Sequence, residues 1–360
     1  MIFLKNVKIE TIDDLRGAVQ QAIELEHSTI PPYLTANFSL QDTGNVYISD
    51  IIGSVLGEEM LHLSISSNLL TAIGGSPVLN KPPFIPKYPG PLPGGVESGL
   101  QVGIEAFSIS LIQNVFMVIE EPEDPIKIEA LAADDQLTIG EFYQKIKRHL
   151  TTLEIEAQAK GSTVFTGNPD HQMTFEKFFP KKLLFPIVNL ETAIRGIDII
   201  VDQGEGTTKD PFVSPDDTTA PEAAHYYRFQ EIVKGRKLVA DPTTKSGYSF
   251  TGDSIPFNNT IPNMTPNPKM DSYPVDSTAY VNSKLFNYSY TNLLNSLHRA
   301  FNGEPEQINN AMGLMFDVRL YALKLLSIPD PNNPGQVAGP SFEYVTSDDL
   351  SPAEKQAVGG

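Results

Sequence analysis

The stretch IIGSVLGEEMLHLSISSNLLTAIGG, residues 51–75, places an acid and a histidine on one apolar stripe. Ile48, Ile52, Val55, Glu59 and His62 follow one another at intervals of four, three, four and three residues, which is the spacing of one helix face. A buried carboxylate is very costly unless it is paired or bound to a metal. The stretch therefore predicts a helix that presents Glu59 and His62 to a metal ion, with an ordinary hydrogen-bonded core pair as the alternative.

Glu26 lies on the apolar stripe of an earlier predicted helix, over residues 11–41. It follows Leu15, Val19 and Ala22 at intervals of four, three and four residues, so we expect it to face the core. The adjacent His27 is expected to be a core or boundary histidine, with a place behind the ligands as the alternative.

This same helix contains Pro31 and Pro32. Proline lacks the N–H that a helix interior needs, and its ring clashes with the preceding turn. We therefore expect the two prolines to kink or interrupt the helix.

A second acid–histidine pair, Glu222 and His225, lies in the stretch APEAAHYYRFQEI. His225, Phe229 and Ile232 line up on one face of a predicted helix that starts near Pro221. An acid in the first turn of a helix is also favoured by the helix dipole. That competing explanation makes His225 the stronger candidate ligand of the pair.

The other candidate acids are less clearly assigned. Glu141 comes three residues after Thr138, as in a capping box at the start of a helix over 138–160. Glu156 fits an inward stripe of that helix about equally well. Glu205 lies between glycines at the end of a helix over 183–203, where unusual backbone geometry near a ligand is allowed.

Composition limits the chemistry. The chain has 360 residues, no cysteine and a formal net charge of −18. This charge argues against nucleic acid and anionic membrane surfaces as partners. Without cysteine, metals must be held by Glu, Asp, His or water, which suits iron, or manganese as the alternative. The chain has no long apolar run and no signal-peptide pattern in MIFLKNVKIE, so a cytoplasmic location is expected.

The remaining periodic segments complete a mainly α-helical plan with long Pro- and Gly-rich connections. Residues 76–100 predict a long loop or lid, and residues 101–119 an apolar helix or strand. We expect a metal-binding bundle over residues 1–235. Residues 236–360 are expected to form a loop-rich extension whose two helices, near 279–302 and 305–327, pack on the bundle.

Seven motifs in order resemble one family. They are AIELEHSTIPPYL, EEMLH with NLLTAIGGSP, YPGPLP, TIGEFY, VDQGEG, HYYRFQEI and AGPSFEY, running from about Leu15 to Tyr344. Together they resemble the ferritin-like domain of the iminophenyl-pyruvate dimer synthase type, associated with the violacein and rebeccamycin pathways. Those pathway enzymes are longer chains with additional domains, so substrate carries over less well than fold and metal.

The resemblance implies a ferritin-like helical bundle with an iron-type carboxylate site of up to two ions per chain. Its position in TIGEFY favours Glu141 over Glu156. The metal ligands implied by the motifs are Glu26, Glu59, His62, Glu141, Glu205 and His225, with Glu222 as a further member.

These observations leave two functions open. The first is a non-haem, di-iron carboxylate oxidoreductase that uses dioxygen on a small organic substrate, for which an amino-acid-derived imine is one candidate. The alternative is an iron-binding, ferritin-like protein without organic catalysis. A scaffold that has lost its site is disfavoured because every expected ligand type is present.

Overall fold

The computed structural model describes residues 4–95, 100–122, 136–204, 211–213 and 222–358. Over these ranges the chain is mainly helical, as the hydrophobic periodicity predicts. None of the helices described is both long and apolar enough to cross a membrane.

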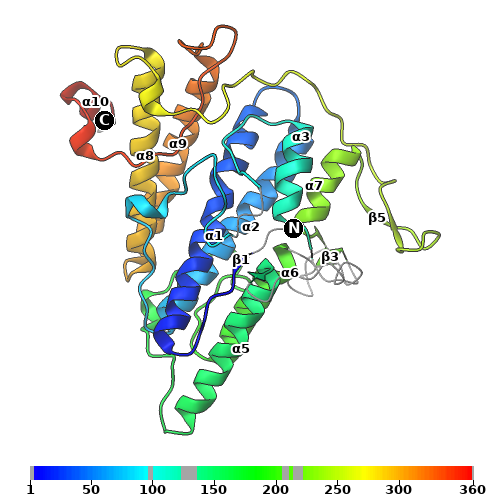
Figure 1. Ribbon diagram of the computed structural model, residues 1–360, viewed down its shortest axis with the longest axis vertical. Coiled ribbons are helices and arrows are strands. Elements are labelled where there is room, and N and C mark those ends of the chain that lie inside the picture. The colour runs from blue at the N-terminus through cyan, green and yellow to red at the C-terminus, as the bar shows by residue number, and fades with distance from the viewer. Residues whose placement is uncertain (1–3, 96–99, 123–135, 205–210, 214–221, 359–360) are drawn as a thin grey trace.

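Helices α1 (Ile12–Ser39) and α2 (Val46–Ala72) pack against each other at the centre of the molecule (Figure 1). Thr11 and Asp14 begin α1 with a capping box, because each side chain accepts a hydrogen bond from the other residue's N–H, at 3.2 and 2.9 Å. The predicted apolar stripes are buried, including Leu15 and Ile52. Burying these two stripes against each other and against neighbouring helices holds the site's two central helices in register.

Four further helical segments surround this pair. Helix α5 (Ile139–Gln158) packs on α1, and α6 (Leu190–Gly204) packs on α2 and α5. On the other side, α3 (Ile109–Leu111), the π-helical segment η2 (Ile112–Phe116) and α4 (Met117–Ile119) follow one another directly. Helix α7 (His225–Lys234) packs against η2, α4 and α2.

Helices α8 (Thr278–Phe301) and α9 (Ile308–Ser327) form a closely packed pair beside α1 and α2 (Figure 1). The short segment η5 (Pro305–Gln307) connects them. Other short helices are η1 (Pro82–Phe84), η3 (Pro169–His171), η4 (Met270–Ser272), η6 (Ser347–Asp349) and α10 (Pro352–Val358).

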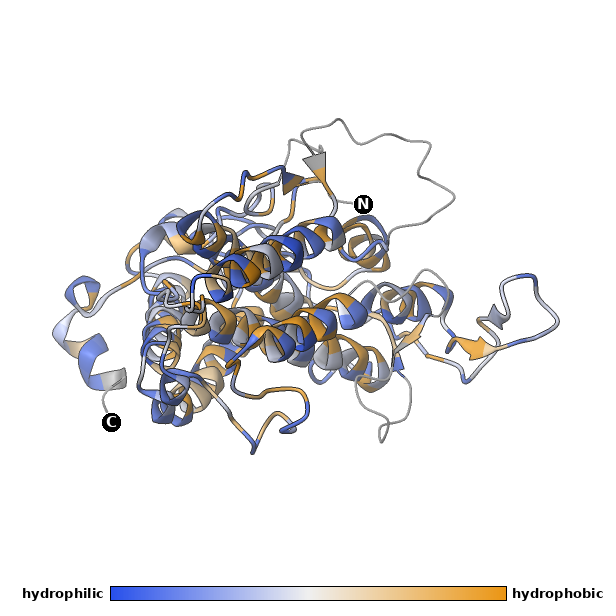
Figure 2. Cartoon of the chain, turned by 90° about the horizontal axis from the view of Figure 1, so that it is seen from below, coloured by the Kyte–Doolittle hydropathy of each residue, from blue (hydrophilic) through white to orange (hydrophobic). Residues whose placement is uncertain are grey.

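The strands are two residues long and pair in antiparallel ladders. These are β1 (Leu4–Lys5) with β2 (Gln136–Leu137), β3 (Phe212–Val213) with β4 (Glu222–Ala223), and β5 (Val239–Ala240) with β6 (Tyr248–Ser249). In register, Leu4 lies opposite Leu137 and Phe212 opposite Ala223. The β5–β6 hairpin extends away from the helices (Figures 1 and 2).

Of the two predicted effects of the prolines, interruption of the first helix is wrong, because α1 continues through both Pro31 and Pro32; a kink there stays a prediction. Pro32 has no N–H to donate to the carbonyl of Ser28, but the buried hydroxyl of Tyr88 donates to that oxygen at 2.7 Å. A side chain from the Pro-rich 76–100 segment thus replaces a missing backbone hydrogen bond.

Replacing Tyr88 by Phe should leave the Ser28 carbonyl buried without this donor. We expect the free energy of unfolding to fall by about 1–3 kcal/mol, measured by urea denaturation. Tyr47→Phe, at a residue that is 61% exposed, is the control and should change stability little. Equal effects of the two substitutions would contradict this account of the helix.

Candidate metal centre

Five buried side chains from four helical segments converge between α1, α2, α4 and α7. They form two groups that share Glu59, and within each group the potential ligand atoms lie within 4.8 Å of one another. We call them the Glu/His cluster: Glu26, Glu59, His62, Glu120 and His225. Carboxylates and histidines brought together on facing helices are the ligand set of di-metal bundle sites.

His62 uses its two ring nitrogens differently. Its Nδ1 lies 3.5 Å from a carboxylate oxygen of Glu26, and its Nε2 lies 3.0 Å from the side-chain oxygen of Gln203 on α6. Burial alone would lower the pKa of His62, but the hydrogen bond and charge of Glu26 raise it. Gln203 therefore fixes the ring so that Nδ1 faces the cluster.

The two ring nitrogens of His225 also have different neighbours. Its Nε2 lies 2.8 Å from Glu58, whereas its Nδ1 lies 3.0 Å from Glu59 and 3.4 Å from Glu120. Nδ1 is buried, yet it makes no hydrogen bond of acceptable geometry within the part of the chain described here. A buried nitrogen that faces two carboxylates but is hydrogen-bonded to neither fits the position of a metal ligand.

Glu120 was not among the predicted ligands, because it lies one residue beyond the segment 101–119 that was predicted to be an apolar helix or strand. It directly follows α4, and its carboxylate accepts a 2.5 Å hydrogen bond from the buried hydroxyl of Tyr33. The signal was present in the sequence, because Ile112, Phe116 and Glu120 are four residues apart. The intervening π-helical segment is of a kind often found at functional sites.

Glu59 and Glu26 are also held by hydroxyl groups. Thr29 donates to Glu59 at 2.8 Å, and Tyr143 on α5 donates to Glu26. Burial, together with the nearby charge of Glu120, raises the pKa of Glu59 to about 7. Three carboxylates within one apolar shell repel each other when ionised, so the cluster favours cations, whether protons or metal ions.

Behind His225 lies a partly buried ion pair whose residues were not among the predicted site residues. Arg228, on the same helix, contacts both carboxylate oxygens of Glu58 at 2.8 and 2.7 Å and donates to Ser54 at 3.0 Å. Burial would raise the pKa of Glu58, but the hydrogen bond from His225 and the charge of Arg228 lower it to about 2. The ionised Glu58 orients His225 toward the cluster.

Two predicted ligands lie elsewhere. Glu141 is exposed, and its carboxylate accepts the N–H of Thr138 at 2.9 Å in a capping box. Glu222 lies on β4, because α7 begins only at His225; its side chain is 64% exposed and 3.6 Å from Arg228. Neither joins the groups formed by the described residues.

Four residues named in the sequence analysis remain. Two of them, Glu205 and Pro221, lie outside the described residues. Glu156 is exposed. His27 does not join the cluster: its Nε2 lies 2.7 Å from the hydroxyl of Tyr290 on α8.

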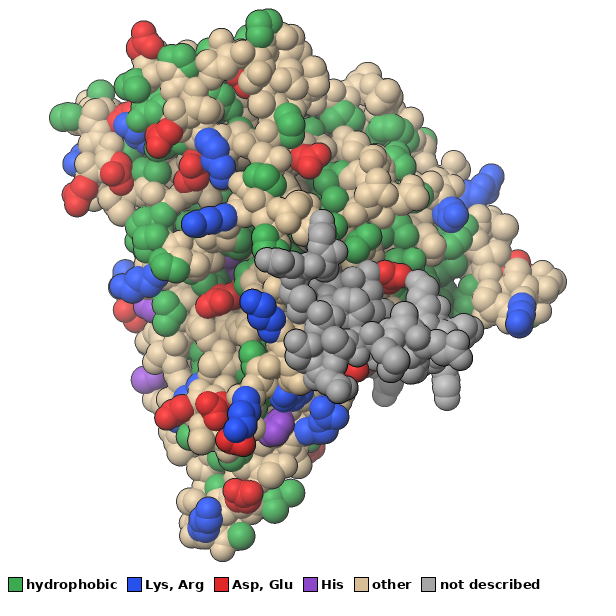
Figure 3. Space-filling model, viewed as in Figure 1, with side chains coloured by type: hydrophobic (Ala, Val, Ile, Leu, Met, Phe, Trp, Pro, Cys, Tyr) green, Lys and Arg blue, Asp and Glu red, His purple; other side chains and the backbone are tan. Residues whose placement is uncertain are grey.

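The cluster borders a small cavity of about 40 Å³, lined by its acids and by apolar residues such as Ile119 and Ile200. All five members of the cluster are at most 7% exposed. On the face of the molecule shown in Figure 3, the Lys and Arg side chains lie interspersed among the Asp and Glu side chains.

This bundle, with acids and histidines facing inward from its central helices, is the architecture of ferritin-like proteins. A family model described as Ferritin-like matches residues 19–234, and the chain belongs to that family. The crystal structure of a ferritin like protein from Caulobacter vibrioides is similar over 92% of this chain and 99% of that chain, with a TM-score of 0.59 and 21% identity. That likeness concerns the fold. Comparison with curated proteins found no match.

The Glu58–Arg228 pair predicts a specific loss of stability in acid. The pKa of Glu58 is lowered from 4.5 to about 2 in the folded protein, so its stabilisation is complete above pH 4.5 and is lost as the pH falls toward 2. We expect this contribution, about 3 kcal/mol, to be missing from the pH dependence of unfolding of Glu58→Gln. Glu156→Gln, at an exposed residue, should show the wild-type dependence of the free energy of unfolding on pH. If the curve for Glu58→Gln ran parallel to the wild-type curve, this assignment of Glu58 would be contradicted.

Proposed function

We propose that this protein is a di-iron carboxylate oxidoreductase that acts on a small organic substrate, with manganese as the alternative metal. The observation that carries the proposal is the Nδ1 atom of His225, buried between Glu59 and Glu120 without a hydrogen bond. A nitrogen that lies within 3.4 Å of two carboxylate oxygens, rather than of one, is placed as in a shared metal-ligand set.

The donor set fits iron. Oxygen and imidazole ligands without thiolate suit ferrous iron or manganese. Glu26, Glu59 and His62 would hold one ion and Glu59, Glu120 and His225 the other, with Glu59 common to both. When bound, iron supplies the one-electron chemistry with dioxygen that no side chain of this chain can supply.

The surrounding residues would set the properties of the site. Tyr33 and Tyr143 donate hydrogen bonds to Glu120 and Glu26. Burial and the adjacent carboxylates raise the pKa of both phenols well above 10, so they remain donors at neutral pH and hold the carboxylates in place. Gln203 and Glu58 orient the two histidines.

The nature of the substrate rests on the sequence resemblance to the iminophenyl-pyruvate dimer synthase type. On that basis we propose an amino-acid-derived imine as the substrate class. The small size of the cavity at the cluster, about 40 Å³, favours a second candidate function, iron binding without organic catalysis.

Metal analysis is the first test. Purified protein loaded anaerobically with ferrous iron should hold about two iron atoms per chain, measured by elemental analysis after desalting. Glu59→Ala/His62→Ala should lose both, because Glu59 belongs to both groups. Glu120→Gln should lose or weaken one ion.

Glu141→Gln and Glu222→Gln are the matched controls, because both acids lie outside the cluster, and both should retain wild-type iron. Absence of iron from the wild type would reject the proposal. Iron retained by Glu120→Gln but lost from Glu141→Gln would reject this ligand set. Once two ions are bound, iron accumulation beyond two per chain would favour the second candidate, whereas substrate-dependent dioxygen consumption would favour the oxidoreductase.

Metal affinity should rise with pH between about 6 and 8. The pKa of Glu59 is raised to about 7 and that of His225 well above 6.5 in the metal-free protein, so an ion must displace protons below these values. Calorimetric titration in buffers of different ionisation enthalpy should detect proton release at pH 6.5. A pH-independent affinity would show that the buried acids are not ligands.

A further inference from the structure

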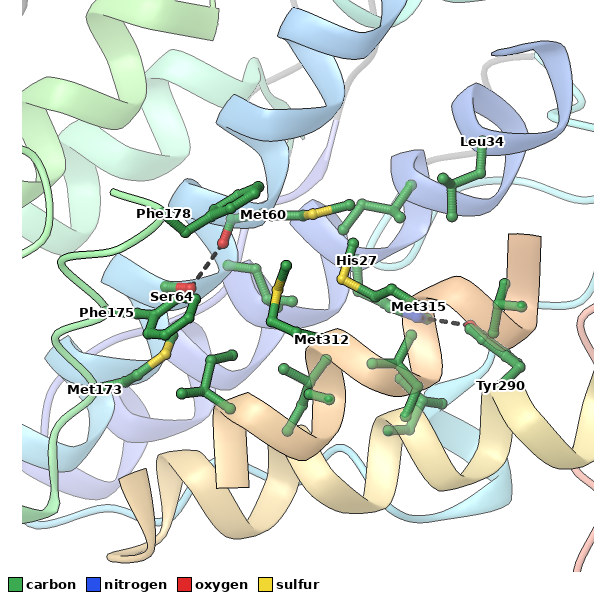
Figure 4. A pocket seen from close by; sticks show the side chains of 18 of the residues that line it. His27, Leu34, Met60, Ser64, Met173, Phe175, Phe178, Tyr290, Met312 and Met315 are labelled. Atoms are coloured by element: carbon green, nitrogen blue, oxygen red, sulfur yellow. Dashed lines mark hydrogen bonds between the residues drawn. The ribbon is translucent and has the colours of Figure 1, made fainter. Parts of the chain in front are cut away.

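A second cavity, of about 240 Å³, lies between the α1–α2 pair and the α8–α9 pair (Figure 4). Its walls are almost wholly apolar. Four methionines line it, namely Met60, Met173, Met312 and Met315. Methionine side chains adapt to ligands of different shape, and they are common at binding surfaces that accept varied partners.

This cavity is separate from the Glu/His cluster. Among the described residues, none lines both cavities. Neighbouring residues of the two central helices line different cavities. On α1, Glu26 lines the cavity at the cluster and His27 lines the apolar cavity. On α2, Glu59 lines the cavity at the cluster and Met60 lines the apolar cavity. The two helices are therefore a partition between two sites.

The wall formed by His27 is buried and already hydrogen-bonded. His27 is 3% exposed, and its Nε2 is hydrogen-bonded to Tyr290 at 2.7 Å. The ring also packs on Phe84 at 4.4 Å between centroids. This part of the wall therefore presents mainly ring surface to a ligand.

The opposite end carries a cation. Arg319, on α9 beyond Met312 and Phe316, lines the cavity and is exposed to solvent. Its guanidinium donates to the side-chain oxygen of Gln41 at 2.7 Å, and no ion pair between described residues involves it. Near it, Phe316 is 66% exposed although it lines the cavity, and Phe178 is 44% exposed, so large apolar groups form a rim open to solvent.

We propose that this cavity binds an amphipathic carboxylate, with its apolar body among the methionines and its carboxylate paired with Arg319. Apolar cavities of about 150 Å³ stay dry and accept one benzene ring, so this cavity suits a body of about ten carbon atoms. The apolar walls supply affinity, and the Arg319 guanidinium at the rim, which makes no ion pair with a described residue, supplies the preference for an anion. The inference does not depend on the proposed metal chemistry.

The test compares decanoate with decanol, which share an alkyl chain but differ in charge. Both should bind metal-free, full-length protein saturably by calorimetry, and decanoate should bind about two- to fivefold more tightly. Arg319→Gln should abolish that difference. Lys324→Gln, on the same helix but outside the cavity, should preserve it. No saturable decanoate binding, or a preference that survives Arg319→Gln, would overturn the proposal.

Filling the cavity should block binding. Met312→Trp or Ser64→Leu should prevent decanoate binding while circular dichroism and thermal unfolding report an intact fold. A folded filling variant that binds decanoate as the wild type does would overturn the proposal. The chain has no tryptophan, so Phe316→Trp at the exposed rim places a single reporter there. Its emission should shift with decanoate, and unchanged emission at saturating decanoate would count equally against the site.

Two further outcomes distinguish other occupants. Glu59→Ala/His62→Ala should bind decanoate unchanged, and loss of binding there would place decanoate at the cluster and overturn the proposal. Self-association that Phe316→Glu abolishes, together with no decanoate binding, would identify the rim as a contact between two copies of the chain and would also overturn it.

Discussion

The need to keep acids inside an apolar bundle is the constraint on which this structure depends. Glu26, Glu59 and Glu120 are each less than 8% exposed, and buried carboxylates are tolerated only with compensating partners. The partners come from every neighbouring segment: hydroxyls from α1 and α5, histidines from α2 and α7. The helices that surround α1 and α2 therefore supply polar groups as well as apolar area, and their arrangement follows from both.

Helical periodicity was enough to bring Glu26, Glu59 and His62 to one place, because α1 and α2 are long and regular and their stripes continue without interruption. It failed where regularity ends. Glu222 does not share a helix face with His225, because α7 begins three residues after Glu222 and Glu222 itself lies on the short strand β4. Glu120 was missed because its helix is short and contains a π-helical segment, which no simple 3.6-residue template represents.

At Pro31 and Pro32, a contact from outside the helix overrides the local sequence preference. Local sequence predicts an interrupted helix at Pro31 and Pro32, yet the carbonyl of Ser28 receives a donor from Tyr88, sixty residues away in sequence. Glu141 shows the reverse case. Its local pattern, Thr138 with an acid three residues later, described its capping role, and the motif resemblance pointed away from that role. The capping-box rule was reliable at Thr138, whereas local rules failed at Pro31 and Pro32, where a distant side chain supplies a hydrogen bond.

The two central helices separate a polar interior from an apolar one, with neighbouring residues such as Glu59 and Met60 facing opposite sides. A thermodynamic consequence follows from this shared partition. If occupation of one side alters the position of α1 or α2, the affinities of the two sides become linked, and the linkage is reciprocal: each occupant changes the other's dissociation constant by the same factor. Through such a linkage, the shared helices would couple the binding of an ion to the binding of an apolar molecule that never touches it.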